Sequence, residues 1–180
     1  ITIMRTDSIF SLLLERIPPD SLTDINNDNY TDSFMYKSVQ SDLDNVRKIA
    51  AVRYLYTAKR IDNDNAIYVV DGLPPTDDDF RAYGSPIERE IMPIMNKCFD
   101  GNIVHGTDII DTSWGMVIPA CEPIKKNGVT IGTLVIEFDG SYFSENTINS
   151  KRYGIIVSIG VAAMVGLVAV MLIRSFSIPL

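Results

Sequence analysis

Hydrophobic positions recur at helical spacing through the first fifty residues of the chain. In Ile1–Arg16 and just beyond it, apolar residues stand three or four positions apart with polar residues between them: Ile9, Phe10, Leu13, Leu14 and Ile17. Pro18 and Pro19 end this predicted helix, and the Asn- and Asp-rich residues 20–32 predict a loop. The helical spacing then returns at Met35, Val39, Leu43, Val46, Ile49 and Ala50. The pattern therefore predicts two amphipathic helices joined by a loop.

Between residues 51 and 71 the pattern changes to β-branched and aromatic residues. Ala51–Lys59 and Ala66–Asp71 predict two strands, and the polar run Asp62–Asn65 predicts the turn of a hairpin between them. Successive side chains of a strand point to opposite faces, so Tyr54 and Tyr56 are expected on one face of the first strand.

A further helix and further strands are predicted up to residue 139. Ser85–Glu88 has the form of a capping box with proline at the first helical position, after the Pro- and Asp-rich loop Gly72–Gly84. The apolar face of the predicted helix is Ile87, Ile91, Ile94, Met95 and Cys98, with a bend or break at Pro93. Strands are predicted at 113–123 and 130–139, joined by a turn at Asn127-Gly128, with 103–110 as a third candidate. Hairpin connections make the sheet antiparallel, so the predicted fold class is α+β with the helices on one face.

The segment Gly154–Ile173 contains no charged residue and is bracketed by Lys151, Arg152 and Arg174. Twenty helical residues span about 30 Å, which is the thickness of the hydrocarbon core of a bilayer. The segment therefore predicts a transmembrane helix, and the alternative is an unusually long buried core helix.

Charge is distributed unevenly along the chain. All 23 acidic residues lie in residues 1–150, together with all of the 16 basic residues except the three that bracket the apolar segment, which leaves this region with a net charge of about −10. Nucleic-acid binding needs a basic surface, so no nucleic-acid partner is expected.

The sequence contains no familiar catalytic signature. A glycine-rich phosphate loop, a nucleophile elbow and a dinucleotide fingerprint are all absent, and His105 is the single histidine. The two cysteines, Cys98 and Cys121, have no zinc-site spacing and are either paired or buried as free thiols. The Asp- and Asn-rich turns do not fit a calcium loop. No catalytic residue, metal or cofactor is therefore expected, and the chain is not expected to be an enzyme.

Aromatic residues on the predicted strands offer a different chemistry. Tyr54, Tyr56, Tyr68 and Trp114 combine an apolar ring with a hydrogen-bonding group, which suits the wall of a small-molecule pocket. The alternative is that these rings fill the core between sheet and helix.

Three segments in order resemble the single Cache domain, a PAS-like extracellular sensor family of bacterial receptors. They are VRYLYTAKR with NAIYVVDG, then YGSP, and then SWGMVIPACEPIKKNGVTIGTLVIEFD, and the resemblance covers about residues 35–143. It implies a PAS-like five-stranded antiparallel sheet with a long N-terminal helix on one side and a ligand pocket on the other. Carried over position by position, the residues nearest the ligand are Tyr54, Tyr56, Tyr68, Asp71 and Trp114.

The residues after the apolar segment resemble the opening of a HAMP linker, whose first helix begins around a proline such as Pro179. The expected organisation is an N-terminal helix and loop at 1–34, a Cache-like domain at 35–150, a transmembrane helix at 151–174 and the start of a HAMP linker at 175–180. This order implies that residues 1–150 are extracytoplasmic and that a first transmembrane helix precedes residue 1.

The resemblance implies the extracytoplasmic small-molecule sensor of a methyl-accepting chemotaxis receptor in the cell membrane. The alternatives are the sensor region of a histidine kinase or a diguanylate cyclase, or a membrane-tethered binding or dimerisation module without a ligand. The expected ligand is an organic acid or an amino acid, and a homodimer is expected through Ile1–Arg16 and the adjoining helix.

Overall fold

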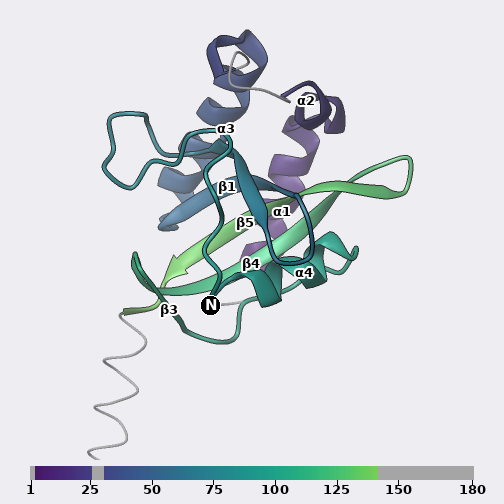
Figure 1. The fold of residues 1–180 in the computed structure, drawn as a ribbon. Coiled ribbons are helices and arrows are strands. Elements are labelled where there is room, and N and C mark those ends of the chain that lie inside the picture. The colour runs from purple at the N-terminus through teal and green to yellow at the C-terminus, as the bar shows by residue number, and fades with distance from the viewer. Residues whose placement is uncertain (1–2, 26–30, 142–180) are drawn as a thin grey trace, which may run out of the picture. The chain divides into compact units, whose positions relative to one another are not determined.

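The computed structural model describes residues 3–25 and 31–141. Its helices are α1 (Ile3–Arg16), α2 (Pro19–Asp24), α3 (Phe34–Ala50) and α4 (Met92–Phe99). Its strands are β1 (Tyr54–Arg60), β2 (Ala66–Asp71), β3 (Ile110–Thr112), β4 (Gly115–Lys126) and β5 (Val129–Asp139). The strands form one antiparallel sheet in the order β2-β1-β5-β4-β3, with β5 in the centre (Figure 1). The predicted α+β class with a five-stranded antiparallel sheet is confirmed.

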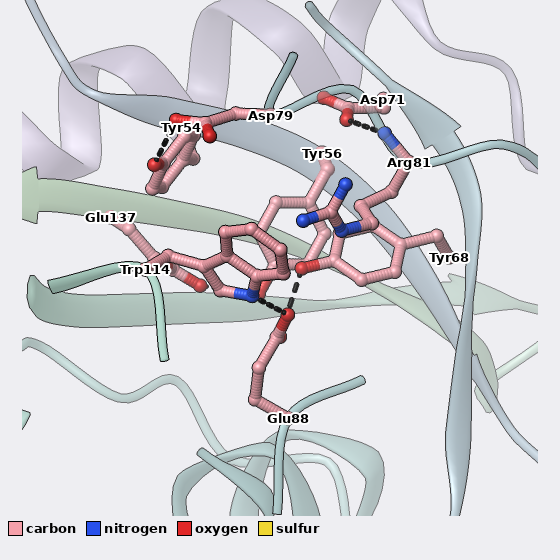
Figure 2. A pocket seen from close by; sticks show the side chains of 9 residues that line it. All are labelled: Tyr54, Tyr56, Tyr68, Asp71, Asp79, Arg81, Glu88, Trp114 and Glu137. Carbon is pink, nitrogen blue, oxygen red and sulfur yellow. Dashed lines mark hydrogen bonds between the residues drawn. The ribbon is translucent and has the colours of Figure 1, made fainter. Parts of the chain in front are cut away.

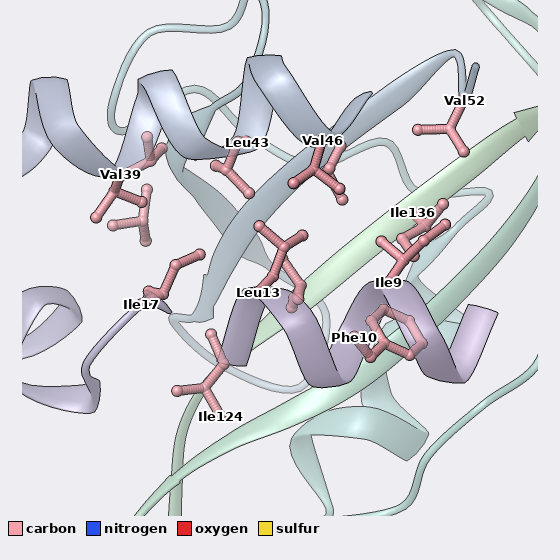
Figure 3. Packing of buried hydrophobic residues seen from close by; sticks show 14 of the residues in the cluster. Ile9, Phe10, Leu13, Ile17, Val39, Leu43, Val46, Val52, Ile124 and Ile136 are labelled. Carbon is pink, nitrogen blue, oxygen red and sulfur yellow. The ribbon is translucent and has the colours of Figure 1, made fainter. Parts of the chain in front are cut away.

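Helices α1 and α3 pack together on one face of the sheet. Leu13 of α1 and Leu43 of α3 are fully buried between the two helices and the strands, where Ile136 of β5 meets them (Figure 3). The apolar stripes predicted from the sequence therefore point inward, as an amphipathic helix requires. Met35 and Ile49 differ from the prediction: their side chains are exposed, by 87 % for Ile49, and Tyr36 takes a buried place instead.

Helix α4 lies on the opposite face of the sheet, so the prediction that all helices gather on one face is wrong. Its buried residues pack with Tyr56, Tyr68 and Val135 in a second core. The capping-box prediction is also wrong, because α4 begins at Met92 and Pro93 stands in its first turn. Residues 85–87 instead run beside β2, where the amide of Tyr68 donates to Ser85 O and that of Ile87 donates to Ala66 O.

Two further segments differ from the prediction. Residues 19–24, expected to be loop, form α2, because Pro19 at the start of a helix supplies the backbone angle that the first turn needs. Residues 103–110 form no continuous strand, and Val104 makes an isolated bridge with Cys121. Outside the described residues lie the predicted transmembrane helix at 151–174 and the predicted HAMP segment at 175–180. Each helix within the described ranges is too short or too polar to cross a bilayer.

Candidate functional site

A cavity opens on the face of the sheet that carries α4. Its lining comes from strands β1, β2 and β5, the loop after β2, the segment before α4 and the turn between β3 and β4 (Figure 2). The lining residues are Tyr54, Tyr56, Tyr68, Asp71, Asp79, Arg81, Glu88, Trp114 and Glu137. The structure thus brings together all five residues named from the sequence and adds four charged ones. The free space between the side chains is about 10 Å³, which is room for a single water molecule.

A β-bulge in the β1–β2 pair places two of the lining residues on the same face. Tyr56 stands opposite Asp71 and Ala58 stands opposite Tyr68, so Val69 is an extra residue on β2. Three positions separate Tyr68 from Asp71, and in a regular strand they would point to opposite faces. The bulge reverses this parity, and both side chains reach the cavity.

The floor of the cavity is a buried pair of Tyr56 and Glu137. The Tyr56 hydroxyl donates to Glu137 Oε1 at 2.6 Å, and both residues are almost fully buried. Burial raises the pKa of Glu137 to about 7; the hydrogen bond from Tyr56 opposes this and the charge of Glu88 adds to it. The ring of Tyr68 lies 4.5 Å from that of Tyr56, and burial raises the pKa of both phenols well above their usual value.

At the rim, carboxylates accept hydrogen bonds from the other aromatic side chains. Glu88 accepts from the Tyr68 hydroxyl at 3.0 Å and from Trp114 Nε1 at 2.6 Å, which ties the segment before α4 to the β3–β4 turn. The Tyr54 hydroxyl donates to Asp79 at 2.6 Å. The hydroxyls of Tyr54, Tyr56 and Tyr68 and the indole N–H are therefore all bonded to a carboxylate.

Asp71 shapes the loop that covers the cavity. Its carboxylate accepts from the amide of Leu73 at 3.0 Å and from the amide of Arg81 at 2.7 Å. Burial raises the pKa of Asp71 to about 6, although both backbone hydrogen bonds act in the opposite direction. The next residue has to be small, because a Cβ at Gly72 would lie 2.7 Å from Leu55 O. Asp71 therefore positions Arg81 as well as lining the cavity.

Arg81 supplies the positive charge among the nine lining residues. Its guanidinium lies against the Trp114 ring (Figure 2), 3.7 Å from the ring centre, in a cation–π contact. Nη1 donates to Phe80 O. Nη2 is buried and has no hydrogen-bond partner among the described residues. A buried donor without a partner carries a desolvation cost that an anionic group would remove. Arg81 is therefore the natural place for a carboxylate of a bound molecule.

The cavity carries more negative than positive charge. Four carboxyl groups line it, and Arg81 faces them. Arg53 lies nearby, but its guanidinium donates to Trp114 O and lies 5.0 Å from the centre of the Tyr54 ring. The charge of the lining therefore favours a positively charged group over a second anion.

Four lining residues were not named from the sequence. Glu137 could have been found, because it is the one acidic residue in the apolar run that precedes Phe138. Glu88 was assigned to a helix cap, and Asp79 belongs to an acidic run that reads as solvated loop. No pattern in the sequence marks Arg81.

Other candidates from the sequence lie outside the cavity. Cys98 of α4 and Cys121 of β4 form a disulfide, which settles the alternative that the sequence left open. His105 lies 3.6 Å from Asp7 of α1, and Glu122 projects toward the same side of the sheet. Within residues 3–25 and 31–141, no group of acidic, histidine or cysteine side chains is arranged to hold a metal ion.

Comparison with known proteins gives a likeness of fold. No protein-family model matches the chain, and no curated protein matches it. The ligand-binding domain of the Campylobacter jejuni chemoreceptor Tlp3, solved in complex with 4-methylisoleucine, aligns with a TM-score of 0.51 and 16% identity over 74% of this chain. The same domain in complex with L-norvaline gives the same values. The alignment spans about half of the solved chain, 49%. The chain thus shares its fold with part of a chemoreceptor ligand-binding domain.

Proposed function

We propose that this chain is the extracytoplasmic sensing region of a transmembrane receptor and that its cavity binds a small molecule. The observation that carries the proposal is the cavity on the α4 face, where tyrosines, Trp114 and four carboxyls surround an unpaired donor of Arg81. Convergent polar groups in an apolar setting are typical of ligand sites. The fold supports a chemotaxis receptor, and a histidine kinase or diguanylate cyclase would use the same sensing region with another output.

The charges favour an amino acid over a simple organic acid. Arg81 Nη2 suits a carboxylate, whereas the carboxyls of Glu137 and Asp79 suit an ammonium group. The rings of Tyr56 and Tyr68 offer an apolar surface for a short side chain. The ligands named for the Tlp3 domain, 4-methylisoleucine and L-norvaline, have this combination of groups.

The disulfide supports an extracytoplasmic location for residues 1–150, and the apolar segment supports anchoring of the protein in the cell membrane. A disulfide persists in an oxidising compartment and is rare in the cytosol. The uncharged segment Gly154–Ile173 has the length of a membrane span.

Signal transmission would begin at β5. This strand carries Glu137 into the cavity, and the chain continues from it toward the proposed transmembrane helix and HAMP linker. A ligand shifts a receptor between two states only as far as it binds one state better than the other. The proposed ligand therefore has to favour one arrangement of β5 against its neighbours.

A homodimer is proposed through α1 and α3. Between these helices lies an apolar groove that includes Leu12, 41% exposed, and Ile49, 87% exposed. Exposed apolar side chains that lie together are typical of an interface. A second copy of the chain would cover them.

A module that binds no small molecule is the second candidate. It is favoured by the small free space and by the carboxylate pairing of the phenol and indole donors. In that case the polar network would serve to hold the sheet, the loop and α4 together.

A thermal-shift screen of the purified chain against amino acids, amines and organic acids separates the two candidates. A ligand at a hundred times its dissociation constant adds about 2.7 kcal/mol of stability, which raises Tm by several degrees. We expect amino acids to give the shift, and we expect Arg81→Gln to abolish it. Arg89→Gln, an exposed arginine next to Glu88, is the matched control and should keep the shift. A panel that gives no shift in the unsubstituted chain would support the module without a ligand.

A further inference from the structure

Glu137 is, with Asp71, one of the two carboxyls of the cavity that are almost fully buried. It is 3% exposed and stands on the central strand, opposite Tyr54 of β1 and Pro119 of β4. The charged and titratable groups that act on it come from four places: Tyr56 on β1, Tyr68 and Asp71 on β2, Glu88 before α4, and Arg53 before β1. Asp79, Arg81 and Tyr54 line the same cavity.

The bonding of Glu137 differs from that of the other carboxyls. Asp71 accepts two backbone amides, and Glu88 accepts two side-chain donors, one on each oxygen. Glu137 accepts the Tyr56 hydroxyl on Oε1, and no ion pair joins it to a cation among the described residues. A buried carboxylate without a cation is costly, and a proton or a bound cation removes the cost.

We propose that Glu137 is the residue by which the cavity selects a positively charged group, and that a proton competes with that group for the same carboxylate. The inference rests on the proposed function, because it assigns one part of the ligand to one residue. Glu137 also lies on the strand that leads out of the domain, so its charge state connects the cavity with β5.

The competition makes binding depend on pH. Burial raises the pKa of Glu137 to about 7, so the ionised fraction rises from about a tenth near pH 6 to about nine tenths near pH 8. The ammonium group of an amino acid stays protonated over this range. A ligand that needs the ionised carboxylate should therefore bind about tenfold more tightly at the higher pH.

L-norvaline and two relatives provide the probes. Pentanoate is L-norvaline without its ammonium group, and butylamine is L-norvaline without its carboxylate. Calorimetry on the 180-residue chain at the two pH values should show about tenfold tighter binding of L-norvaline near pH 8. Pentanoate should lack this gain, and in Glu137→Gln the affinity for L-norvaline should be weak and nearly independent of pH. Glu122→Gln is the matched control, because it makes the same change on the adjacent strand outside the cavity, and it should keep the wild-type profile.

Carbon NMR of the glutamate carboxyls tests the inference directly, with Glu137→Gln identifying the Glu137 signal. If the Glu137 signal titrates with a midpoint near neutral pH, and this midpoint falls when butylamine is added, the result supports the competition. A midpoint that is unchanged by butylamine and by L-norvaline overturns the inference. If L-norvaline still binds in calorimetry, the proposed function survives that result; if no amino acid binds, the proposed function fails separately.

Discussion

At the scale of single residues, the cavity is a set of hydrogen bonds in which rings donate and carboxylates accept. Tyr56 donates to Glu137, and Trp114 and Tyr68 share Glu88. These bonds fix the orientation of the rings. Burial of the same groups raises the pKa of Tyr56, Tyr68 and Glu137, because each would have to become charged in a poorly solvated place. The ionised form of Glu137 is therefore energetically costly at neutral pH.

This cost predicts how stability depends on pH. The pKa of Glu137 is about 7 in the folded chain, against an ordinary value of 4.5. The folded state therefore binds the extra proton between these values, so this contribution to stability is fully present below about pH 4.5 and is lost as the pH rises through about 7. Glu137→Gln should be more stable than the unsubstituted chain by up to about 3 kcal/mol near pH 8, and the difference should vanish at acid pH. Urea unfolding across the pH range measures it.

The exposed Glu90 provides the control for this experiment. Glu90→Gln should leave the pH profile of stability unchanged. If Glu137→Gln and the unsubstituted chain lose stability in parallel as the pH rises, Glu137 is not the group responsible.

At the scale of elements, a β-bulge and a disulfide fix the structure around the cavity. The bulge at Val69 turns Asp71 and Tyr68 to the same face of β2. The disulfide from Cys98 to Cys121 fastens α4 to β4, and both cysteines are fully buried. The bulge thus sets which side chains of β2 line the cavity, and the disulfide attaches to the sheet the helix that follows the Glu88 segment of the lining.

Removal of the disulfide should lower stability without abolishing the sheet. The bond spans 23 residues of sequence, and a loop of this size is worth about 3 kcal/mol through the entropy of the unfolded chain. The double variant Cys98→Ala/Cys121→Ala should lose about this amount in urea unfolding. A reductant should destabilise the unsubstituted chain and leave the double variant unaffected. Equal stability of the two proteins in oxidising buffer would show that the bond contributes nothing.

The start of α3 depends on its cap. The Ser33 hydroxyl accepts the amide of Tyr36 at 3.1 Å, and Ser33→Ala should cost about 1 kcal/mol because this amide loses its partner. Ser41→Ala, at an exposed position within the same helix, should be neutral or slightly stabilising since alanine is the better helix former. Thermal unfolding of both variants distinguishes the two positions, and equal losses would exclude a capping role for Ser33.

At the scale of the whole folded unit within residues 3–140, a helical layer and the cavity lie on opposite faces of one sheet. Helices α1 and α3 cover one face, and α4 lies on the other (Figure 1). The lining residues of the cavity lie on the same side as α4. The central strand serves both, since Leu134 and Ile136 point into the helical core and Val135 and Glu137 point the other way. A change at the cavity floor can therefore reach the helical face through β5.

The helical face predicts the mode of self-association. If a second copy covers the groove between α1 and α3, Ile49→Glu should shift the chain from dimer to monomer in sedimentation experiments. Val129→Glu places the same charge on an exposed apolar residue of the β4–β5 hairpin and should leave the dimer intact. If the two variants sediment alike, the interface does not lie in the groove between α1 and α3.

Local patterns in the sequence were sufficient for most of the fold. The helical spacing of apolar residues around Leu13 and around Leu43 predicted two helices, and the turn at Asn127-Gly128 predicted the longest hairpin. These signals succeed because they act between residues that are close in sequence. The start of α4 was misplaced for the converse reason. Residues 85–87 follow the edge of β2 through long-range hydrogen bonds, and these override a local capping signal.

For the candidate site, the sequence by itself determined the aromatic members and Asp71, through strand patterns and a family resemblance. The tertiary structure decided their charged partners. Asp79, Arg81 and Glu88 lie within residues 79–88, and Glu137 lies on β5, distant in sequence, so only the folded sheet brings the two parts together. Glu137 acquires its chemistry from burial against Tyr56, which stands on another strand. Local sequence determines which elements form, whereas the desolvation of a charge depends on everything packed around it, and only the assembled sheet sets that environment.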